Sequence, residues 1–405
     1  MEEQKQKSPR PLEGVRILEM GQLLAGPFAA VLLGWFGAEV IKIEPPGIGD
    51  PLRNWRKMHN GTALWWYILG RNKKCVTLNL KDPRGHEIVK QLVGKVDVLI
   101  ENFKPGTLEK WGLGYEELKQ INPQLIMSRV SGYGQTGPYS SRPGYASVAE
   151  GYGGFRYVNG EPDRPPARPN LSLGDTLAGL HSALGILMAL YHRDAKQTGQ
   201  GQMIDVAIYE SVFNMMESVI PEFDKLGEIR ERQGAKISGI VPTNTYLTQD
   251  GKYVIIGGNG DSIYKRLMTA AGRADLANDP RLTHNAGRVE HEAEIDAAIE
   301  SWTREHSYDE VFAALDQAGV PVGPIYSAAD MVKDPHFIAR GLFEDADIGN
   351  GETIKLPTFV PKLSATPGGT EWIGPPLGSH NQEIYCEFLG MNETEFIRLQ
   401  EDGVI

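Results

Sequence analysis

An aspartate stands at the start of an apolar segment, where a carboxylate could act as a nucleophile. In N-L-S-L-G-D-T-L-A-G-L-H-S-A-L-G-I-L (170–187), Asp175 precedes leucines at helical spacing, and small side chains fill most other positions. The pattern predicts a helix that is buried nearly all round and begins near Asp175. There the carboxylate could cap the first-turn amides, or it could be held by the positive end of the helix for chemistry.

Motifs for several other common chemistries are missing from the sequence. The first strand-to-helix turn reads G-Q-L-L-A-G-P instead of G-x-G-x-x-G, and there is neither a P-loop nor a G-x-S-x-G elbow. His86-Glu87 and His291-Glu292 lack a second histidine four positions on, so neither forms an H-E-x-x-H zinc site. We therefore expect no metal, nicotinamide or flavin, and Asp175 remains the best-placed reactive group.

Composition limits the class of protein. A chain of 405 residues predicts at least two domains, and a net charge of -11 without a basic block argues against nucleic acid as a partner. The two cysteines, Cys75 and Cys386, lie far apart, which is typical of a reducing compartment. The polar start resembles no signal peptide, and the longest apolar run is too short for a bilayer. We expect a cytoplasmic protein that does not contact membranes.

Strand and helix patterns alternate over the first half of the chain. Strands are predicted at 15–20, 39–44, 75–80, 96–100, 125–130 and 202–208, with helices at 26–36, 83–94 and 114–121. This alternation indicates an α/β domain with a doubly wound sheet. A charged stretch at 222–236 reads as a linker, and 237–330 as a smaller unit with a hairpin at Asp250-Gly251. The Gly- and Pro-rich tail is expected to extend over another surface.

Several motifs in their order resemble one family, the class III CoA-transferases, also called the formyl-CoA transferase family. They include P-L-E-G-V-R-I-L-E-M (11–20), G-A-E-V-I-K-I-E-P-P-G-I-G-D (37–50), D-V-L-I-E-N-F-K-P-G (97–106), S-G-Y-G-Q-T-G-P (131–138), L-G-D (173–175) and G-Q-G-Q-M-I-D-V-A-I-Y-E-S (199–211). Asp175 occupies the place of the family's nucleophile. The resemblance therefore favours the catalytic interpretation of Asp175, with which a capping role can coexist.

The resemblance also implies an architecture. It implies a Rossmann-like large domain made of both chain ends, 1–221 and 331–405, a linker at 222–236 and a small central α+β domain at 237–330. Two subunits would interlock, either as a homodimer or with a paralogous chain, and the tail would wrap the partner.

The activity that the resemblance implies is CoA transfer through a covalent carboxylate. Asp175 would attack an acyl-CoA to give a mixed anhydride and then an aspartyl-CoA thioester, with coenzyme A and acyl-CoA as substrates. The sequence is most similar in character to members that use succinyl-CoA and a short dicarboxylic or hydroxy-dicarboxylic acid such as malate or citramalate.

Family motifs also indicate residues for the two substrates. The positions that match the CoA site are Leu23, Leu24, Lys81, Asn102 and Lys110, with Arg71, Lys73 and Lys74 nearby in sequence. The candidates for the acceptor are Arg53, Arg56, Arg142 and Tyr145, with Ser238 and Gly239 in place of the family's glycine run. Formyl-CoA transferase has an arginine that contacts adenine where this chain has Pro45, so this contact is not carried over from the resemblance.

Two alternatives stay open from the sequence. An α-methylacyl-CoA racemase needs a second base, a histidine before an aspartate, but Tyr145 and Ala146 occupy those positions. Ala146 also lacks the acid found there in many transferases, so a supporting carboxylate must come from elsewhere. The second alternative is a non-catalytic subunit of a mixed complex, against which the retention of Asp175 argues.

Overall fold

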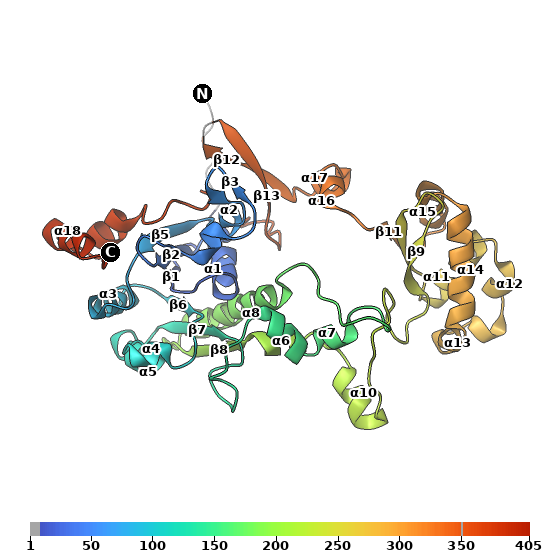
Figure 1. The fold of residues 1–405 in the computed structure, drawn as a ribbon, viewed down its shortest axis with the longest axis horizontal. Coiled ribbons are helices and arrows are strands. Elements are labelled where there is room, and N and C mark those ends of the chain that lie inside the picture. The colour runs from blue at the N-terminus through green and yellow to red at the C-terminus, as the bar shows by residue number, and fades with distance from the viewer. Residues whose placement is uncertain (1–8, 350) are drawn as a thin grey trace. The chain divides into compact units, whose positions relative to one another are not determined.

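The structure, a computed structural model, describes residues 9–349 and 351–405. It divides into two compact units (Figure 1). The sheet unit comprises the chain up to Phe155, Pro169–Glu217 and Ile338–Ile405, and the second unit comprises Arg156–Arg168 and Ser218–Phe337. These bounds differ from those expected, because 156–168 joins the second unit and the charged stretch 222–236 is part of that unit.

A six-stranded parallel sheet organises the sheet unit, as the alternating pattern predicts. In spatial order its strands are β5 (Lys73–Thr77), β2 (Glu39–Glu44), β1 (Arg16–Glu19), β6 (Val98–Glu101), β7 (Ile126–Ser131) and β8 (Met203–Ala207). In chain order this is 3-2-1-4-5-6, the Rossmann arrangement, so the direction of winding reverses between β1 and β6. In such sheets ligands bind beyond the carboxyl ends of the strands near this reversal.

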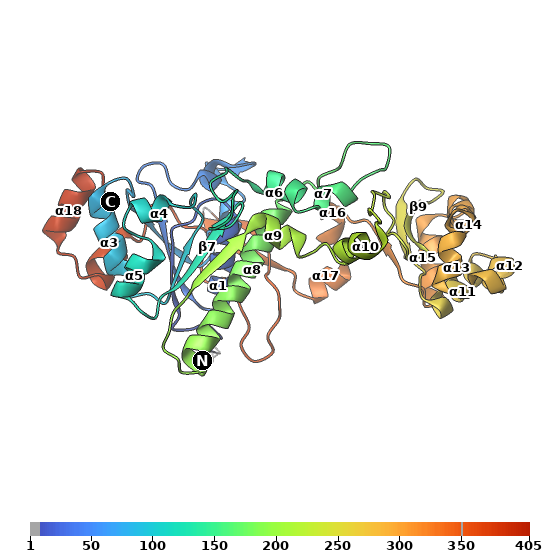
Figure 2. The same cartoon turned by 90° about the horizontal axis from the view of Figure 1, so that it is seen from below.

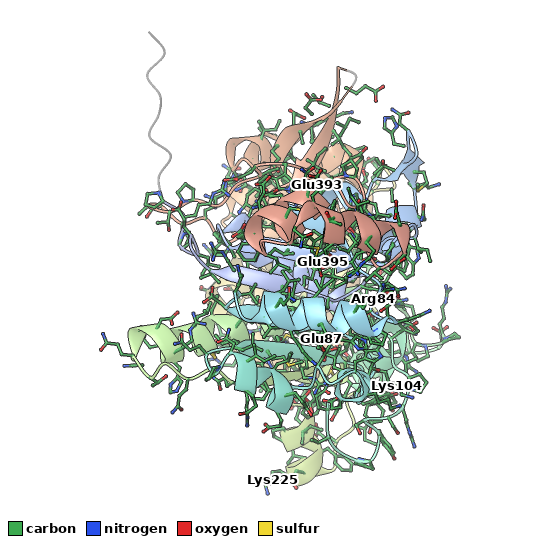
Figure 3. The ribbon with its side chains drawn as sticks, turned by 90° about the vertical axis from the view of Figure 1, so that its left-hand side faces the viewer. Arg84, Glu87, Lys104, Lys225, Glu393 and Glu395 are labelled. Carbon is green, nitrogen blue, oxygen red and sulfur yellow. The ribbon has the colours of Figure 1, made fainter. Side chains whose placement is uncertain are left out.

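Two layers of helices cover the sheet (Figure 2). One face packs against α1 (Ala25–Trp35) and α8 (Leu173–Leu190), and the other against α3 (Pro83–Val93), α4 (Thr107–Lys110), α5 (Tyr115–Ile121) and α18 (Glu393–Glu401). Alternate strand residues point to opposite faces, so Ile17 joins the α1 and α8 core while Leu18 joins the other. The outer surfaces of α3 and α18 carry charges such as Arg84 and Glu393 (Figure 3).

Short elements complete the sheet unit. They are η1 (Pro51–Asn54), β3 (Met58–His59), β4 (Thr62–Ala63), α2 (Trp66–Leu69), α6 (Ala146–Tyr152), η2 (Tyr191–Ala195), α9 (Ile208–Phe213), β12 (Phe343–Gly349), β13 (Glu352–Pro357) and η4 (Glu383–Phe388). Two helices, α7 (Phe155–Val158) and α17 (Pro335–Ala339), include the residues at which one unit passes to the other.

The second unit has its own core around a three-stranded antiparallel sheet. Its strands are β9 (Thr243–Leu247), β10 (Tyr253–Gly257) and β11 (Val322–Pro324), and β9 and β10 form the hairpin expected at Asp250-Gly251. Its helical elements are α10 (Val219–Leu226), α11 (Asp261–Ala270), α12 (Ala274–Ala277), η3 (Pro280–Leu282), α13 (Asn285–Glu290), α14 (Glu292–Glu305), α15 (Tyr308–Gln317) and α16 (Ala328–Met331).

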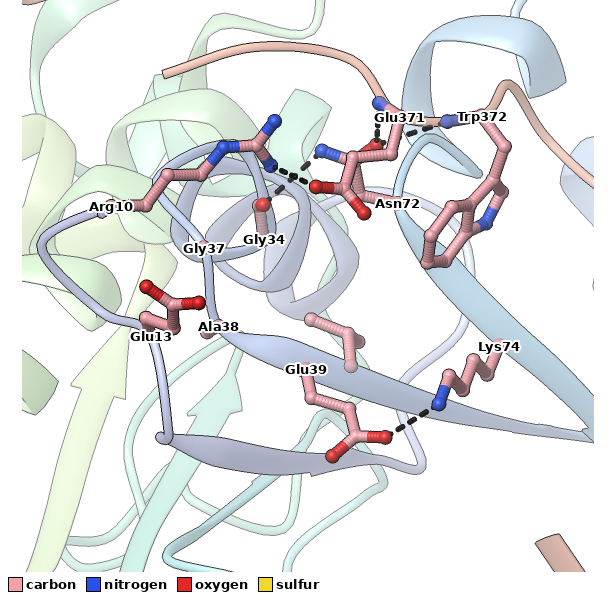
Figure 4. A pocket seen from close by; sticks show the side chains of 11 residues that line it. Arg10, Glu13, Gly34, Gly37, Ala38, Glu39, Asn72, Lys74, Glu371 and Trp372 are labelled. Carbon is pink, nitrogen blue, oxygen red and sulfur yellow. Dashed lines mark hydrogen bonds and ion pairs between the residues drawn. The ribbon is translucent and has the colours of Figure 1, made fainter. Parts of the chain in front are cut away.

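The extended tail packs on its own sheet unit. The side-chain oxygen of Asn72 accepts a hydrogen bond from the Glu371 amide at 2.7 Å, and its nitrogen donates to the Gly369 carbonyl at 2.8 Å. Figure 4 shows the adjoining crevice, where Arg10 pairs with Glu371. The tail therefore lies over another surface as expected, and for these residues that surface belongs to the same chain.

Helix α8 packs against the sheet unit through its small residues, whereas several of its leucines are exposed. Its small residues, such as Ala178, Gly179 and Ser182, are buried, whereas Leu184 is 50% and Met188 61% exposed. The expectation of a helix buried nearly all round is therefore wrong for this chain. Within the described residues α8 and its continuation, Leu173–Ala195, are long and apolar enough to cross a membrane, but their contacts with α1 and β7 identify a core helix.

A glycine sets the separation of α1 and α8. A Cβ at Gly179 would lie 2.8 Å from the Ala25 carbonyl oxygen and 2.9 Å from the Phe28 ring. Backbone cannot move out of the way as a flexible side chain can, so a larger residue at this position must push the two helices apart.

We expect Gly179→Ala to lower the free energy of unfolding by about 2–3 kcal/mol through this overpacking. Gly151→Ala in α6 is the matched control, because nothing lies within 4 Å of its added Cβ. Alanine there should be neutral or stabilising by up to about 1 kcal/mol. Chemical denaturation of both variants measures the difference, and equal stabilities would contradict the proposed contact.

Candidate active site

Asp175 lies at the carboxyl edge of the sheet. It is the third residue of α8, partly buried, with Ser172 rather than Asp175 as the N-cap residue. A Cβ on the preceding Gly174 would lie 3.2 Å from Ile208, which directly follows the carboxyl end of β8. The first turn of α8 is thus placed where ligands bind in sheets of this kind.

The start of α1 comes close to Asp175. Gly179 contacts Ala25, the first residue of α1, and Asp175 stands one turn further toward the N-terminus, about 6 Å along the axis. The turn that leads into α1, residues Gly21–Leu24, directly precedes Ala25 in the chain. Leu23 and Leu24 belong to this turn, and their place beside Asp175 in one site stays a prediction of the family motifs.

A second carboxylate adjoins the first turn of α8. Glu150 on α6 is fully buried, and its Oε1 accepts a hydrogen bond of 3.4 Å from the Gly174 amide. It lies one turn after Ala146, whose Cβ would be 3.4 Å from a Cβ on Gly174. Sequence reasoning missed Glu150, although the i, i+4 spacing from Ala146 on a helix would have indicated it.

Asn102 holds the turn before α1. Its side-chain oxygen accepts from the Gln22 amide and its nitrogen donates to the Gln22 carbonyl, both at 2.8 Å. These two bonds use one acceptor site and one N–H of the carboxamide. Asn102 therefore orients the turn, and its contact with the coenzyme stays a prediction of the family motif.

A cavity of about 140 Å³ opens beside this turn at the ends of β1, β2, β5 and β6. It is lined by Met20, Gln22, Ile43, Pro45, Leu78, Asn79, Leu80, Lys81, Phe103 and Trp111. The Phe103 and Trp111 rings meet edge to face, 5.5 Å apart, and form an aromatic wall. Of this lining, the sequence analysis named only Lys81, and Pro45 as a departure; Gln22, Phe103 and Trp111 were missed.

Three lysines stand near this cavity without an ion pair in the described parts of the chain. Lys81 lines the cavity, Lys104 follows Phe103, and Lys110 precedes Trp111. All three are exposed, so their charges are available to an anionic ligand. Lys104 was not among the residues indicated by the family motifs.

Lys73 belongs to a buried charge cluster instead. Its ammonium lies 2.6 Å from Glu19 Oε2, and both side chains are fully buried. Burial lowers the pKa of Lys73, although Glu19 opposes that shift. Lys42 pairs with the other Glu19 oxygen at 2.7 Å and with Asp50 at 2.9 Å. The expected contact of Lys73 with the coenzyme does not fit this geometry.

Arg71 and Lys74 also pair within the protein. Arg71 is fully buried, 2.9 Å from Glu344, and donates to the Pro357 carbonyl, so it fastens β12 and β13 to the sheet unit. Lys74 contacts Glu39 and Glu383, each at 2.6 Å. Neither residue is placed at the cavity, and we leave both out of the candidate site.

The three arginines expected at the acceptor differ in their surroundings. Arg53 donates two 2.7 Å hydrogen bonds to the buried Glu44, so its positive charge is already paired within the protein. Arg56 stacks on Trp65 at 4.1 Å and Arg142 on Tyr139 at 3.5 Å, and both are exposed. For these two the described residues provide no ion-pair partner.

The remaining predicted residues lie apart from these contacts. Tyr145, just before α6, is 70% exposed. Ser238 and Gly239 belong to the second unit, where they line a cavity of about 480 Å³ together with Glu222 and Arg230.

A buried acid supports the aromatic wall. Glu101 accepts a 2.7 Å bond from the Phe103 amide and pairs with Arg129 at 2.7 Å, and Arg129 also pairs with Glu109. Burial raises the pKa of Glu101 to about 7, against the attraction of Arg129. The hydrogen bond from Arg129 lowers the pKa of the more exposed Glu109.

Comparison with known proteins identifies the class. Residues 12–381 match CoA-transferase family III, and the chain belongs to this family. It is 51% identical to succinyl-CoA–D-citramalate CoA-transferase of Chloroflexus aurantiacus, over 99% of both chains. It is 41% identical to the beta subunit of succinyl-CoA–L-malate CoA-transferase of the same organism, over 98% of both.

A solved structure agrees with the fold. A CAIB/BAIF family protein from Brucella suis matches with a TM-score of 0.82 and 35% identity, covering 94% of this chain and 99% of that one. The protein is therefore a class III CoA-transferase, as its motifs indicate, and its substrates are acyl-CoA esters and carboxylates.

The raised pKa of Glu101 predicts a pH-dependent stability. The folded state keeps the Glu101 proton up to about pH 7, whereas the unfolded chain releases it near pH 4.5. The protonated Glu101 therefore stabilises the folded state fully below pH 4.5, and this stabilisation is lost as the pH rises toward 7. Between pH 5 and 8 we expect the wild type to lose about 2 kcal/mol more unfolding free energy than Glu101→Gln.

Glu109→Gln is the control with the opposite sign. The lowered pKa of Glu109 contributes stability above pH 4.5, which is lost as the pH falls. Urea denaturation at several pH values measures both, and parallel pH profiles for wild type and Glu101→Gln would contradict the assignment.

Proposed function

We propose that this enzyme transfers CoA from succinyl-CoA to a short dicarboxylic or hydroxy-dicarboxylic acid of the citramalate or malate type. The observation that carries the proposal is the 51% identity, over essentially the whole chain, to a succinyl-CoA–D-citramalate CoA-transferase. The position of Asp175 in the first turn of α8, at the carboxyl edge of the sheet, supports the same chemistry.

The reaction proceeds by exchange at the Asp175 carboxylate. A carboxylate oxygen attacks the succinyl thioester, the C–S bond breaks, and CoA thiolate leaves a mixed anhydride. The thiolate attacks the aspartyl carbonyl of the anhydride and releases succinate. The acceptor carboxylate attacks the resulting aspartyl thioester, expels the thiolate and forms a second anhydride. Thiolate attack on the acceptor carbonyl then releases the new acyl-CoA and restores Asp175.

The cavity beside the turn is the proposed adenine site. Its aromatic and apolar walls suit a flat base, and Pro45 adds to the apolar lining in place of a charged contact. Lys81, Lys104 and Lys110 are the proposed partners of the coenzyme phosphates. Leu23 and Leu24 would line the path from this cavity to Asp175.

Arg56 and Arg142 are the proposed ligands of the acceptor's remote carboxylate. A guanidinium can bind a carboxylate through two parallel hydrogen bonds, and stacking on an aromatic ring restricts its motion beforehand. Arg53 is excluded from this role because its guanidinium already forms two hydrogen bonds to the Glu44 carboxylate.

The subunits are proposed to form the interlocked dimer of the family, as a homodimer or with a paralogous chain. The exposed leucines of α8 support this, since monomers rarely leave so continuous an apolar stripe in water. A cytoplasmic location is proposed with it. The racemase alternative has no support at Tyr145 and Ala146, where neither side chain supplies the second base.

Replacement of Asp175 tests the reaction. We expect Asp175→Ala to lower kcat by at least about a thousandfold, because no other group forms the anhydride. Asp275→Ala, at the first turn of α12, is the control and should keep its activity. The assay uses the purified chain alone with succinyl-CoA and a panel of carboxylic acids, and mass spectrometry of the thioester products.

Two outcomes would overturn the proposal. One is substantial turnover by Asp175→Ala. The other is the absence of oxygen-18 in the Asp175 peptide after cycling with labelled acceptor. Activity that appears only with a paralogous chain would instead assign this chain to a mixed complex.

Substitution of the two exposed arginines tests acceptor recognition. We expect Arg56→Ala or Arg142→Ala to raise the KM for a dicarboxylate about 10- to 100-fold, through loss of a charged hydrogen-bond pair. The KM for a monocarboxylate of equal length should not change. Arg304→Ala on α14, which pairs with Glu300, is the control. Equal effects on both acceptor classes would exclude a role at the remote carboxylate.

A further inference from the structure

The turn Gly21–Leu24 adjoins the cavity and leads into α1, and buried side chains hold its main chain. Lys42 donates to the Gly21 carbonyl at 2.9 Å, and the Asn102 side chain bonds to both the main-chain amide and the main-chain carbonyl of Gln22. The Leu23 amide donates to both carboxylate oxygens of Asp50, at 3.1 and 3.2 Å. The turn is thus held along its length by side chains from neighbouring strands and loops.

Leu23 has a backbone conformation that leucine seldom adopts. Its φ is +63°, in the left-handed region, where a side chain crowds the backbone. Such a conformation persists only where surrounding contacts impose it. The bond from Leu23 to Asp50 is the contact made by this residue's own amide, so it is the one that holds the conformation.

Asp50 is itself fixed from three sides. It is 1% exposed, its amide donates to Glu44 at 2.8 Å, and its side chain accepts from the Leu52 amide at 2.9 Å. Lys42 pairs with it at 2.9 Å and with Glu19 at 2.7 Å. Asp50 is therefore a rigid anion whose charge is balanced by Lys42.

We propose that Asp50 is a positioning residue for CoA transfer. With Lys42 behind it, its carboxylate imposes the left-handed conformation on Leu23 and so fixes the turn that joins the coenzyme cavity to Asp175. Gln22 of this turn lines the cavity, and Ala25, which follows the turn, contacts α8 at Gly179, one helical turn after Asp175. This inference rests on the proposed function, because it assumes that the acyl-CoA passes along the turn.

Graded substitutions of Asp50 test the inference. Asp50→Asn keeps an acceptor for Leu23 but loses the charge, whereas Asp50→Ala loses both. We expect the KM for succinyl-CoA to rise about tenfold in Asp50→Asn and about a hundredfold in Asp50→Ala, with a smaller change in kcat and none in acceptor KM. If Asp50→Ala does not fold, Asp50→Asn supplies the measurement.

Hydrogen exchange provides a readout that does not need activity. The peptide covering residues 20–28 should exchange at least about tenfold faster in the Asp50 variants, while peptides of the second unit stay unchanged. Glu344→Gln is the matched control, since it breaks another ion pair to a buried cation, Arg71, away from the turn. It should lower stability without changing the succinyl-CoA KM or the exchange of 20–28.

A double-mutant cycle links the effect to Leu23. Glycine tolerates a positive φ, so Asp50→Asn should cost less in a Leu23→Gly background than in the wild type. Additive effects, or a folded Asp50→Ala with unchanged succinyl-CoA KM or unchanged exchange at 20–28, would overturn the inference. A wild type without CoA transfer would refute the proposed function instead, and the exchange measurement would still report whether Asp50 holds the turn.

Discussion

The close packing of α1 on α8 is the constraint on which the site depends. Both helices follow parallel strands, so both begin at the carboxyl edge of the sheet. Gly179, in the second turn of α8, lets the α8 backbone reach the carbonyl of Ala25, the first residue of α1. Under the proposed function, the small residues at this contact place the helix that carries Asp175 against the helix that follows the turn Gly21–Leu24.

Charged residues at the carboxyl edge of the sheet fall into two groups. Some form buried ion pairs with one another, and others are exposed. Glu19, Glu44 and Asp50 are matched by Lys42, Lys73 and Arg53 within hydrogen-bonding distance, so this buried cluster presents little net charge. An acidic protein must still attract a polyanionic coenzyme. Under the proposed function, that task falls to Lys81, Lys104 and Lys110, which are exposed and form no ion pair within the described residues.

The sequence predicted the order of the elements well, because periodicity and turn signals are local. The strand expected at 75–80 is paired at 73–77, since beyond Thr77 the chain leaves the ladder and the Asn79 amide bonds to the Val404 carbonyl near the C-terminus. The role of each lysine and arginine could be predicted less well from the sequence. Arg71 could be excluded from the site only by knowing that Glu344, 273 positions away, lies beside it. Partners so distant in sequence leave no local pattern.

A buried carboxylate, Glu150 on α6, adjoins the first turn of α8, although residue 146 carries none. At residue 146 a side chain longer than alanine would meet the first turn of α8, since the Ala146 Cα lies 3.5 Å from a Cβ on Gly174. Glu150 stands one turn later on the same side of α6, and its longer side chain reaches the same turn from a buried position. A buried acid thus reaches this turn from further along α6, and alanine at 146 lets α6 approach α8 closely. Glycine at 174 and alanine at 146 are then two halves of one packing contact, and a change at either position would displace both carboxylates together.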